Sequence, residues 1–291
     1  MAFAACSLGV ALFAGMDAAV KLVSIAIGVY SALLWRSAAG ALLGGGLMLA
    51  LRRPWPDRRA LGLHILRGVV VSLMAYCFFW ALMRLPLAEG IALSFVAPLI
   101  ALYLAALMLG ERVTRRAVVA SVIGLAGVGV ILIGKLGAMQ HGPDALWGVA
   151  AVLFSAVLYA GNLILQRKQA QLSSPVDIAF FQHLIMFLIF LVAAPWHLVW
   201  PPADQWPMIL LSAVLAFVSL ALIAWAYARA EAQRLIPVEY SAFVWSVLAG
   251  WLVFGESLTP WTFSGSMLII AGSLLAVWGN TNIAHVESST V

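Results

Sequence analysis

Ionisable side chains are rare within the long apolar segments of this sequence, and each one there could bind a charge or carry a proton. Asp17 and Lys21 lie four residues apart, so a helix would place them on one face, where they can pair. An unpaired ionised group inside a membrane costs several kcal/mol. Two interpretations therefore stay open for this pair: a functional site, or a neutralised pair near the outer end of a helix.

Further ionisable residues lie in apolar surroundings. Arg36 is deep in its segment and could bind a carboxylate, whereas Arg67, beside His64 near the start of another segment, can extend to the lipid headgroups. His183 and Glu239 are candidate proton sites, or interior polar groups satisfied by hydrogen bonds. The candidates for coupling or charge pairing are Asp17, Lys21, Arg36, His183 and Glu239.

Aromatic and hydroxyl-bearing residues form a second group of candidates in the central apolar segments. Their rings can line an apolar cavity while hydroxyl and amide groups bind a substrate. The alternative is a belt at the membrane surface, where Trp and Tyr are also enriched. Pro98 would bend its helix beside the cavity or only for packing. The candidates for substrate binding are Tyr76, Phe79, Trp80, Ser94, Phe95, Pro98, Tyr159, Asn162, Trp225, Tyr240, Ser241 and Trp245.

Motifs for enzymatic chemistry are absent from the sequence. It contains no nucleotide-binding glycine loop, nucleophile elbow, pair of catalytic carboxylates or cluster of zinc ligands. Cys6 and Cys77 match no metal or redox spacing, so we expect them to be small buried side chains. We therefore predict a protein that is not an enzyme and that uses neither a metal nor a cofactor.

The composition predicts an all-α membrane protein. Of 291 residues, 65% are hydrophobic and 9% are charged, and the mean hydropathy is +1.07; in a soluble domain about a quarter of the residues are charged. A spanning helix needs about 20 apolar residues, because lipid offers the backbone no hydrogen-bond partners. Ten such spans are predicted, at 3–24, 29–51, 60–83, 88–109, 117–134, 146–166, 176–194, 207–228, 235–254 and 261–279.

The basic residues predict how the chain is oriented. Eleven Lys and Arg residues follow even-numbered spans, against three that follow odd-numbered ones. By the positive-inside rule the even-numbered loops are cytoplasmic, and with ten spans both termini are cytoplasmic too. The net charge of +5 is thus explained by topology rather than by a nucleic-acid partner. We predict a multi-pass monomer in a bacterial inner membrane, with the lipid bilayer and a small-molecule substrate as its partners.

The two halves of the sequence are related by a displacement of 145 residues. The matched pairs include Trp80 and Trp225, Arg84 and Arg229, Gly110 and Gly255, and Glu111 and Glu256. Each half, at 1–136 and 144–280, would hold five spans before a cytoplasmic tail at 281–291. Because five is odd, the second half would be inverted relative to the first, and this arrangement is typical of transporters that open alternately to either side.

Glycines recur every seven residues in the fifth and tenth predicted spans. Gly127 and Gly134 share one face of the fifth span, and Gly265, Gly272 and Gly279 share one face of the tenth. Small faces allow helices to approach closely. We therefore predict that these two spans pack on each other, away from the substrate.

These motifs resemble the drug/metabolite transporter superfamily, specifically its ten-helix EamA branch. The resemblance covers nearly the whole chain, and its motifs are Pro86-Leu-Ala-Glu89, Ala97-Pro98, Gly110-Glu111-Arg112 and Gly255-Glu256-Ser257. It implies a central cavity between helices one to four and six to nine, with helices five and ten outside. Arg36 falls where the family often has an Arg on helix two.

Within this branch the sequence is most similar to the YddG-type exporters. That similarity implies export of aromatic and other neutral amino acids by alternating access. Other members of the branch move riboflavin, S-adenosylmethionine or nucleotide-like metabolites. A proton-coupled exporter of lipophilic cations, which would require Asp17 or Glu239, is a further alternative.

Overall fold

Helices make up nearly all of the chain that the computed structural model describes, which comprises residues 1–97, 99–100, 103–104, 115–137, 143–170, 172–227, 238 and 240–278. These ranges hold eleven α-helices and one 3-10 helix, without a strand. The bounds are α1 (Ala2–Ile27), α2 (Val29–Ala50), α3 (Arg58–Leu82), α4 (Leu87–Ser94), α6 (Arg115–Gly137), α7 (Pro143–Ala170), α8 (Pro175–Val192), α9 (Ala194–His197), η1 (Ala203–Gln205), α10 (Trp206–Tyr227), α12 (Ala242–Phe254) and α13 (Pro260–Trp278).

Eight of the ten predicted spans coincide with helices to within four residues at each end. The number of helices differs from the prediction because α9 adds a single turn after α8 that was not expected. Six helices, α1, α2, α3, α7, α8 and α10, contain segments that are long and apolar enough to cross a membrane. The described part of the chain is therefore that of a multi-pass helical membrane protein.

The predicted span at 88–109 is wrong as a continuous helix, because α4 ends at Ser94. Phe95 and Val96 form a turn in which each amide bonds the carbonyl three residues earlier, at 3.2 Å. In a continuous α-helix the amide of residue 98 would donate to the Ser94 carbonyl. Residue 98 is a proline, which has no amide hydrogen, so this hydrogen bond cannot form. Pro98, singled out as a possible bend beside a cavity, itself lies outside the described residues.

The predicted span at 235–254 is also interrupted. Helix α12 begins at Ala242, and Tyr240 and Ser241 form a turn in which the Ser241 amide donates to the Val238 carbonyl at 2.9 Å. Residues 235–237 and the candidate Glu239 lie outside the described part of the chain. Each half thus has a turn within its fourth predicted span.

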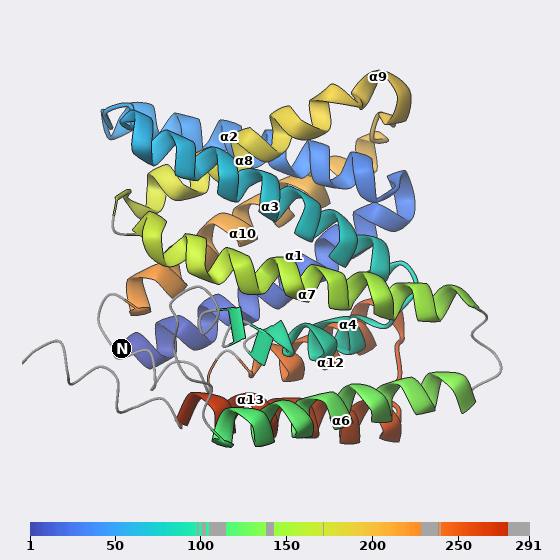
Figure 1. The fold of residues 1–291 in the computed structure, drawn as a ribbon. Coiled ribbons are helices and arrows are strands. Elements are labelled where there is room, and N and C mark those ends of the chain that lie inside the picture. The colour runs from blue at the N-terminus through green and yellow to red at the C-terminus, as the bar shows by residue number, and fades with distance from the viewer. Residues whose placement is uncertain are drawn as a thin grey trace, which may run out of the picture.

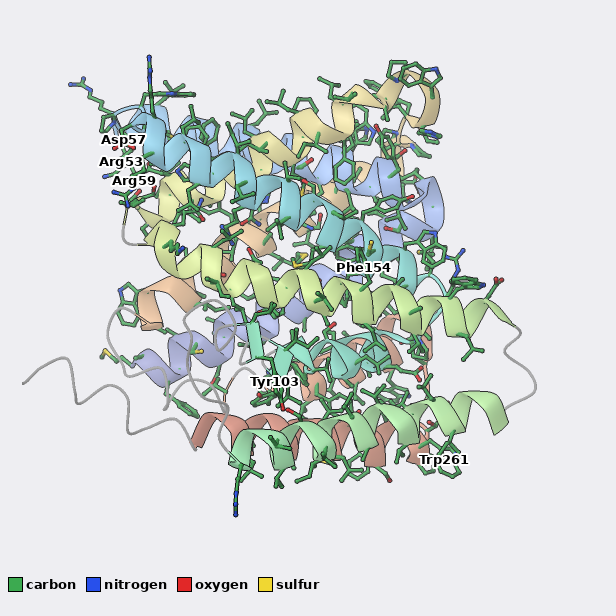
Figure 2. The ribbon with its side chains drawn as sticks, in the orientation of Figure 1. Arg53, Asp57, Arg59, Tyr103, Phe154 and Trp261 are labelled. Atoms are coloured by element: carbon green, nitrogen blue, oxygen red, sulfur yellow. The ribbon has the colours of Figure 1, made fainter. Side chains whose placement is uncertain are left out.

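The bundle has two ends, which Figure 1 shows at its left and right. The N-terminal end holds the start of α1 and the turn from α2 to α3. The opposite end, here called the distal end, holds Gly28 between α1 and α2, the turn from α3 to α4 and the turn from α12 to α13. Figure 2 shows Arg53, Asp57 and Arg59 together at the N-terminal end and Trp261 near the distal end.

Helices α6 and α13 pack on each other through their glycines, which confirms the predicted contact between these two helices. A Cβ atom on Gly127 would lie 2.5 Å from the Gly265 carbonyl oxygen, and one on Gly265 would lie 2.6 Å from that of Gly127. The two backbones are therefore in direct contact. The pair lies along one side of the bundle (Figure 1).

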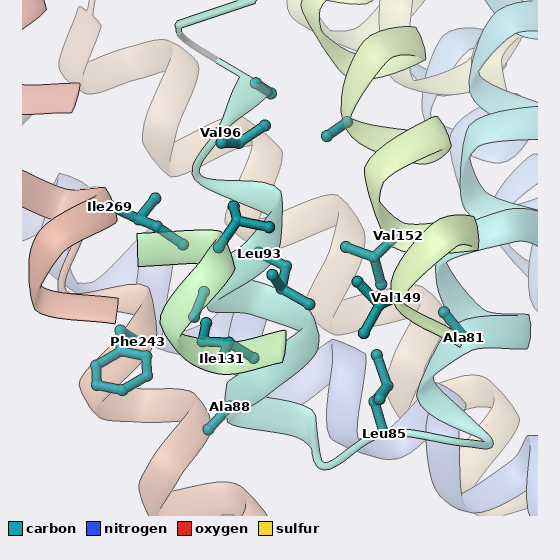
Figure 3. Close-up of a cluster of buried hydrophobic side chains, with 14 of the residues drawn as sticks. Ala81, Leu85, Ala88, Leu93, Val96, Ile131, Val149, Val152, Phe243 and Ile269 are labelled. Carbon is teal, nitrogen blue, oxygen red and sulfur yellow. The ribbon is translucent and has the colours of Figure 1, made fainter. Parts of the chain in front are cut away.

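The described apolar core is divided into several clusters between the helices. One cluster joins α4, α6, α7, α12 and α13 through side chains such as Leu93, Ile131, Val149 and Ile269 (Figure 3). A second joins α1, α2, α3 and α8. Many large apolar side chains also face outward; Leu42 and Leu49 on α2 are 78% and 81% exposed. Such a surface suits lipid and not water.

Candidate functional site

The Lys21 ammonium takes part in a polar network at the distal end of the bundle. It forms an ion pair with Glu256, which follows α12, and donates to the Leu85 carbonyl at 3.0 Å. The second Glu256 oxygen accepts from the Leu87 amide at 2.7 Å. We call these four residues the distal bridge. It joins α1, the turn between α3 and α4, and the turn between α12 and α13.

The predicted pairing of Lys21 with Asp17 is therefore wrong. The Lys21 side chain is long enough to reach the distal turns, where a carboxylate, a carbonyl and the Phe254 ring, 4.8 Å away, all stabilise a cation. Lys21 is 6% exposed and Glu256 is 19% exposed at the side chain, so the pair is largely withdrawn from water. Gly250 makes room for it, because a Cβ atom there would lie 2.7 Å from a Glu256 oxygen.

A pocket of about 160 Å³ lies beside the distal bridge. It is lined by residues of α4, α12 and the turn that follows α12, among them Glu89, Val247, Glu256 and Thr259. This lining is not the predicted ring of aromatic side chains. Sequence reasoning had used Glu89 and Glu256 only as family motifs and had given neither a role.

Asp17, Arg36 and His183 come together in the interior from α1, α2 and α8. All three are buried, and Arg36 interacts electrostatically with both of the others. The His183 ring bonds the Ala179 carbonyl through Nδ1 at 2.8 Å. It also lies against Gly40, one turn along α2 from Arg36. Three of the five charge candidates thus form one cluster, which the sequence did not predict.

A further polar network joins α3 to α7. Arg67 donates to the amide oxygens of Asn162 at 2.9 Å and of Gln169 at 2.8 Å, and the Gln169 amide nitrogen bonds the His64 ring at 2.5 Å. Arg67 is buried, so the expectation that it extends to the lipid headgroups is wrong. Because the Asn162 oxygen accepts from Arg67, this network holds α3 against α7. Sequence reasoning missed Gln169.

The aromatic candidates divide into three situations. Phe79 lies in the core and Tyr76 packs against it, whereas the Trp80 ring lies 3.4 Å from the Arg84 guanidinium. Phe95 and Tyr240 contact each other edge to face at 5.0 Å, just after α4 and just before α12. Their place in a cavity stays a prediction.

The remaining candidates lie partly at the surface and partly in the interior. Trp225 and Trp245 are each 39% exposed, so both are partly at the surface of the bundle. Tyr159 packs against the first core cluster. The Ser94 hydroxyl donates to the Gly90 carbonyl of its own helix, whereas the Ser241 hydroxyl has no hydrogen-bond partner in the described structure.

The chain belongs to the EamA-like transporter family, whose model matches residues 1–133 and 146–278. This family lies within the drug/metabolite transporter superfamily. A solved crystal structure matches the fold with a TM-score of 0.60 at 22% identity, over 94% of this chain and 96% of that one. The protein is therefore a membrane transporter of this class.

Curated relatives carry different substrates. The chain is 27% identical to the pseudopaline exporter CntI of Pseudomonas aeruginosa, over 90% of each chain. It is 24% identical to an S-adenosylmethionine uptake transporter of Rickettsia bellii, over 74% of this chain and 72% of that one. It is 26% identical to a riboflavin transporter of Rhizobium johnstonii, over 78% and 72%. These relatives include both an exporter and an uptake transporter.

Proposed function

We propose that this protein exports amino acids, aromatic and other neutral ones included, across a bacterial inner membrane by alternating access. Two inverted halves of five spans each would exchange their conformations around a site between them. The N-terminal end of the bundle, which carries Arg52, Arg53, Arg58 and Arg59, would face the cytoplasm, and the distal end would face outward.

The pattern of helix contacts supports two related halves. If each helix is replaced by its counterpart 145 residues away, the contact of α1 with α10 becomes that of α7 with α3, and the contact of α2 with α10 becomes that of α8 with α3. All four contacts are present, and the pairs α2–α8 and α6–α13 map onto themselves. The two stretches that match the family model begin 145 residues apart as well.

The distal bridge is the observation that supports the proposal of alternating access. Lys21 and the Leu85 and Leu87 backbone belong to the first half, and Glu256 belongs to the second. An outward opening between the halves has to separate these groups. The bridge therefore favours the state that is closed at the distal end, and its rupture accompanies the exchange of states.

Transport by purified protein tests the substrate. We expect proteoliposomes to take up labelled phenylalanine and leucine saturably, and unlabelled neutral amino acids to compete. Empty liposomes are the control, and the assay is run with and without a proton gradient. Uptake of riboflavin or S-adenosylmethionine without uptake of any amino acid would replace the proposed substrate and leave the transporter class intact.

A further inference from the structure

Asp17, Arg36 and His183 lie near the middle of the bundle's depth. Asp17 is ten residues from the distal end of α1, Arg36 seven residues from that of α2, and His183 nine residues from that of α8. At 1.5 Å per residue these positions are about 15, 10 and 14 Å deep, in a hydrocarbon layer about 30 Å thick. They are therefore deeper than Lys21, six residues from the same end of α1.

The polar atoms of this cluster are incompletely satisfied within the described residues. Arg36 is 8% exposed, yet among the residues that the structure describes its Nε has no hydrogen-bond partner and none of its nitrogens forms an ion pair within 4.0 Å. His183 is 1% exposed, and within the described part of the chain neither its Nε2 nor the Gln182 amide oxygen has a hydrogen-bond partner. Asp17 acts on Arg36 electrostatically without forming a close pair.

A buried arginine without a close partner is costly, because the interior supplies no water to solvate it. Inside the bundle an anion can offset that cost. A carboxylate matches the planar guanidinium with two parallel hydrogen bonds. Asp17, which lies near Arg36 but more than 4.0 Å from its nitrogens, is placed to attract a positive group on the same ligand.

We propose that Arg36 binds the carboxylate of the transported substrate and that Asp17 binds its amino group. The cluster is then the polar subsite for an α-amino acid, a conclusion that rests on the proposed function. His183 positions the ligand: its ring is held by the Ala179 carbonyl and lies against Gly40, beside Arg36. Because the site is near mid-depth, it is reachable from either end as the halves exchange states.

The test compares phenylalanine with two analogues, phenethylamine, which lacks the carboxylate, and 3-phenylpropionate, which lacks the amino group. Competition against labelled phenylalanine is measured in proteoliposomes with the wild type, Arg36→Gln and Asp17→Asn. We expect Arg36→Gln to raise the half-competing concentration of phenylalanine at least tenfold and to leave that of phenethylamine unchanged. Asp17→Asn should weaken phenethylamine and leave 3-phenylpropionate unchanged.

Folding is controlled separately. Elution as a single species in size exclusion shows that a variant is folded, and if Arg36→Gln fails this criterion, Arg36→Lys replaces it. Lysine keeps the charge and loses the two-pronged geometry, so a smaller weakening is expected. Arg53→Gln, at the N-terminal end, is the matched control and should behave as the wild type.

Two outcomes separate this inference from the proposed function. If the wild type takes up no amino acid, the proposed substrate is wrong; thermal stabilisation by 3-phenylpropionate that disappears in Arg36→Gln would still support the anion site. If a folded Arg36→Gln variant competes and is stabilised like the wild type, the inference is overturned, whatever the wild type transports.

Discussion

Removing the distal bridge should open the distal end of the transporter. In Lys21→Met, Glu256 keeps its hydrogen bond from the Leu87 amide and loses its cation, while the Leu85 carbonyl loses its donor. The side chains of the pair are 6% and 19% exposed. The pair therefore lies between an exposed ion pair, worth up to about 1 kcal/mol, and a buried one, whose rupture costs about 3–5 kcal/mol.

An intermediate loss of about 2 kcal/mol from the closed state corresponds to a roughly 30-fold higher ratio of open to closed molecules. Ser24 is a suitable reporter, since it is 3% exposed and lies three residues beyond Lys21 toward the distal end. In a Cys6→Ala, Cys77→Ala background, Ser24→Cys is labelled with a membrane-impermeant maleimide added from the distal side. Lys21→Met should accelerate labelling at least tenfold.

The control and the refuting result are specific to the bridge. Arg53→Gln breaks the 3.0 Å ion pair with Asp177 at the other end, and it should leave labelling of Ser24→Cys unchanged. A double-mutant cycle with Glu256→Gln should show a coupling of about 1–2 kcal/mol between the two positions. If Lys21→Met labels within twofold of its parent, the bridge does not hold the distal end closed.

Three further variants and one control, Gly129→Ala, test the packing and the buried hydrogen bonds. Gly250→Ala places a methyl group 2.7 Å from a Glu256 oxygen, so it should also speed labelling of Ser24→Cys, by less than Lys21→Met. Gly265→Ala meets a backbone oxygen at 2.6 Å, whereas Gly129→Ala meets nothing within 4 Å; in thermal unfolding the first should cost about 1–3 kcal/mol and the second nothing measurable. Gln169→Ala removes partners of two buried side chains and should cost about 1–3 kcal/mol, measured by urea unfolding in detergent.

The helices were predictable because lipid imposes a long apolar window on every spanning segment. The prediction was wrong where one residue overrides that pattern: the apolar window continues past Ser94, but Pro98 lacks the amide that would continue the helix there. The turn at Tyr240 and Ser241 has no comparable signal among the described residues. The contact between α6 and α13 was predictable from the spacing of glycines, because only small residues allow backbones to meet.

The site was predictable in its members and not in its pairings. Asp17, Lys21 and Arg36 were recognisable as candidate site residues, because an ionisable side chain within an apolar helix is energetically costly. Their partners depend on how helices pack, and Lys21 and Glu256 are 235 positions apart in the chain. Local spacing suggested Asp17 as the partner of Lys21. In the structure Lys21 instead pairs with the distant Glu256 carboxylate and donates to the Leu85 carbonyl. A glutamate directly after an apolar span was the signal that would have found it.

The glycine contact between α6 and α13 also limits how the protein can move. Where backbone meets backbone, no side chain can change rotamer to allow sliding, and any shift would create either a collision or a gap. Helices α6 and α13 are thus suited to remain a fixed support. Helices α1, α3 and α12, which meet at the distal bridge, would tilt against that support. Each transport cycle would then begin and end in the same register, set by atoms that cannot adjust.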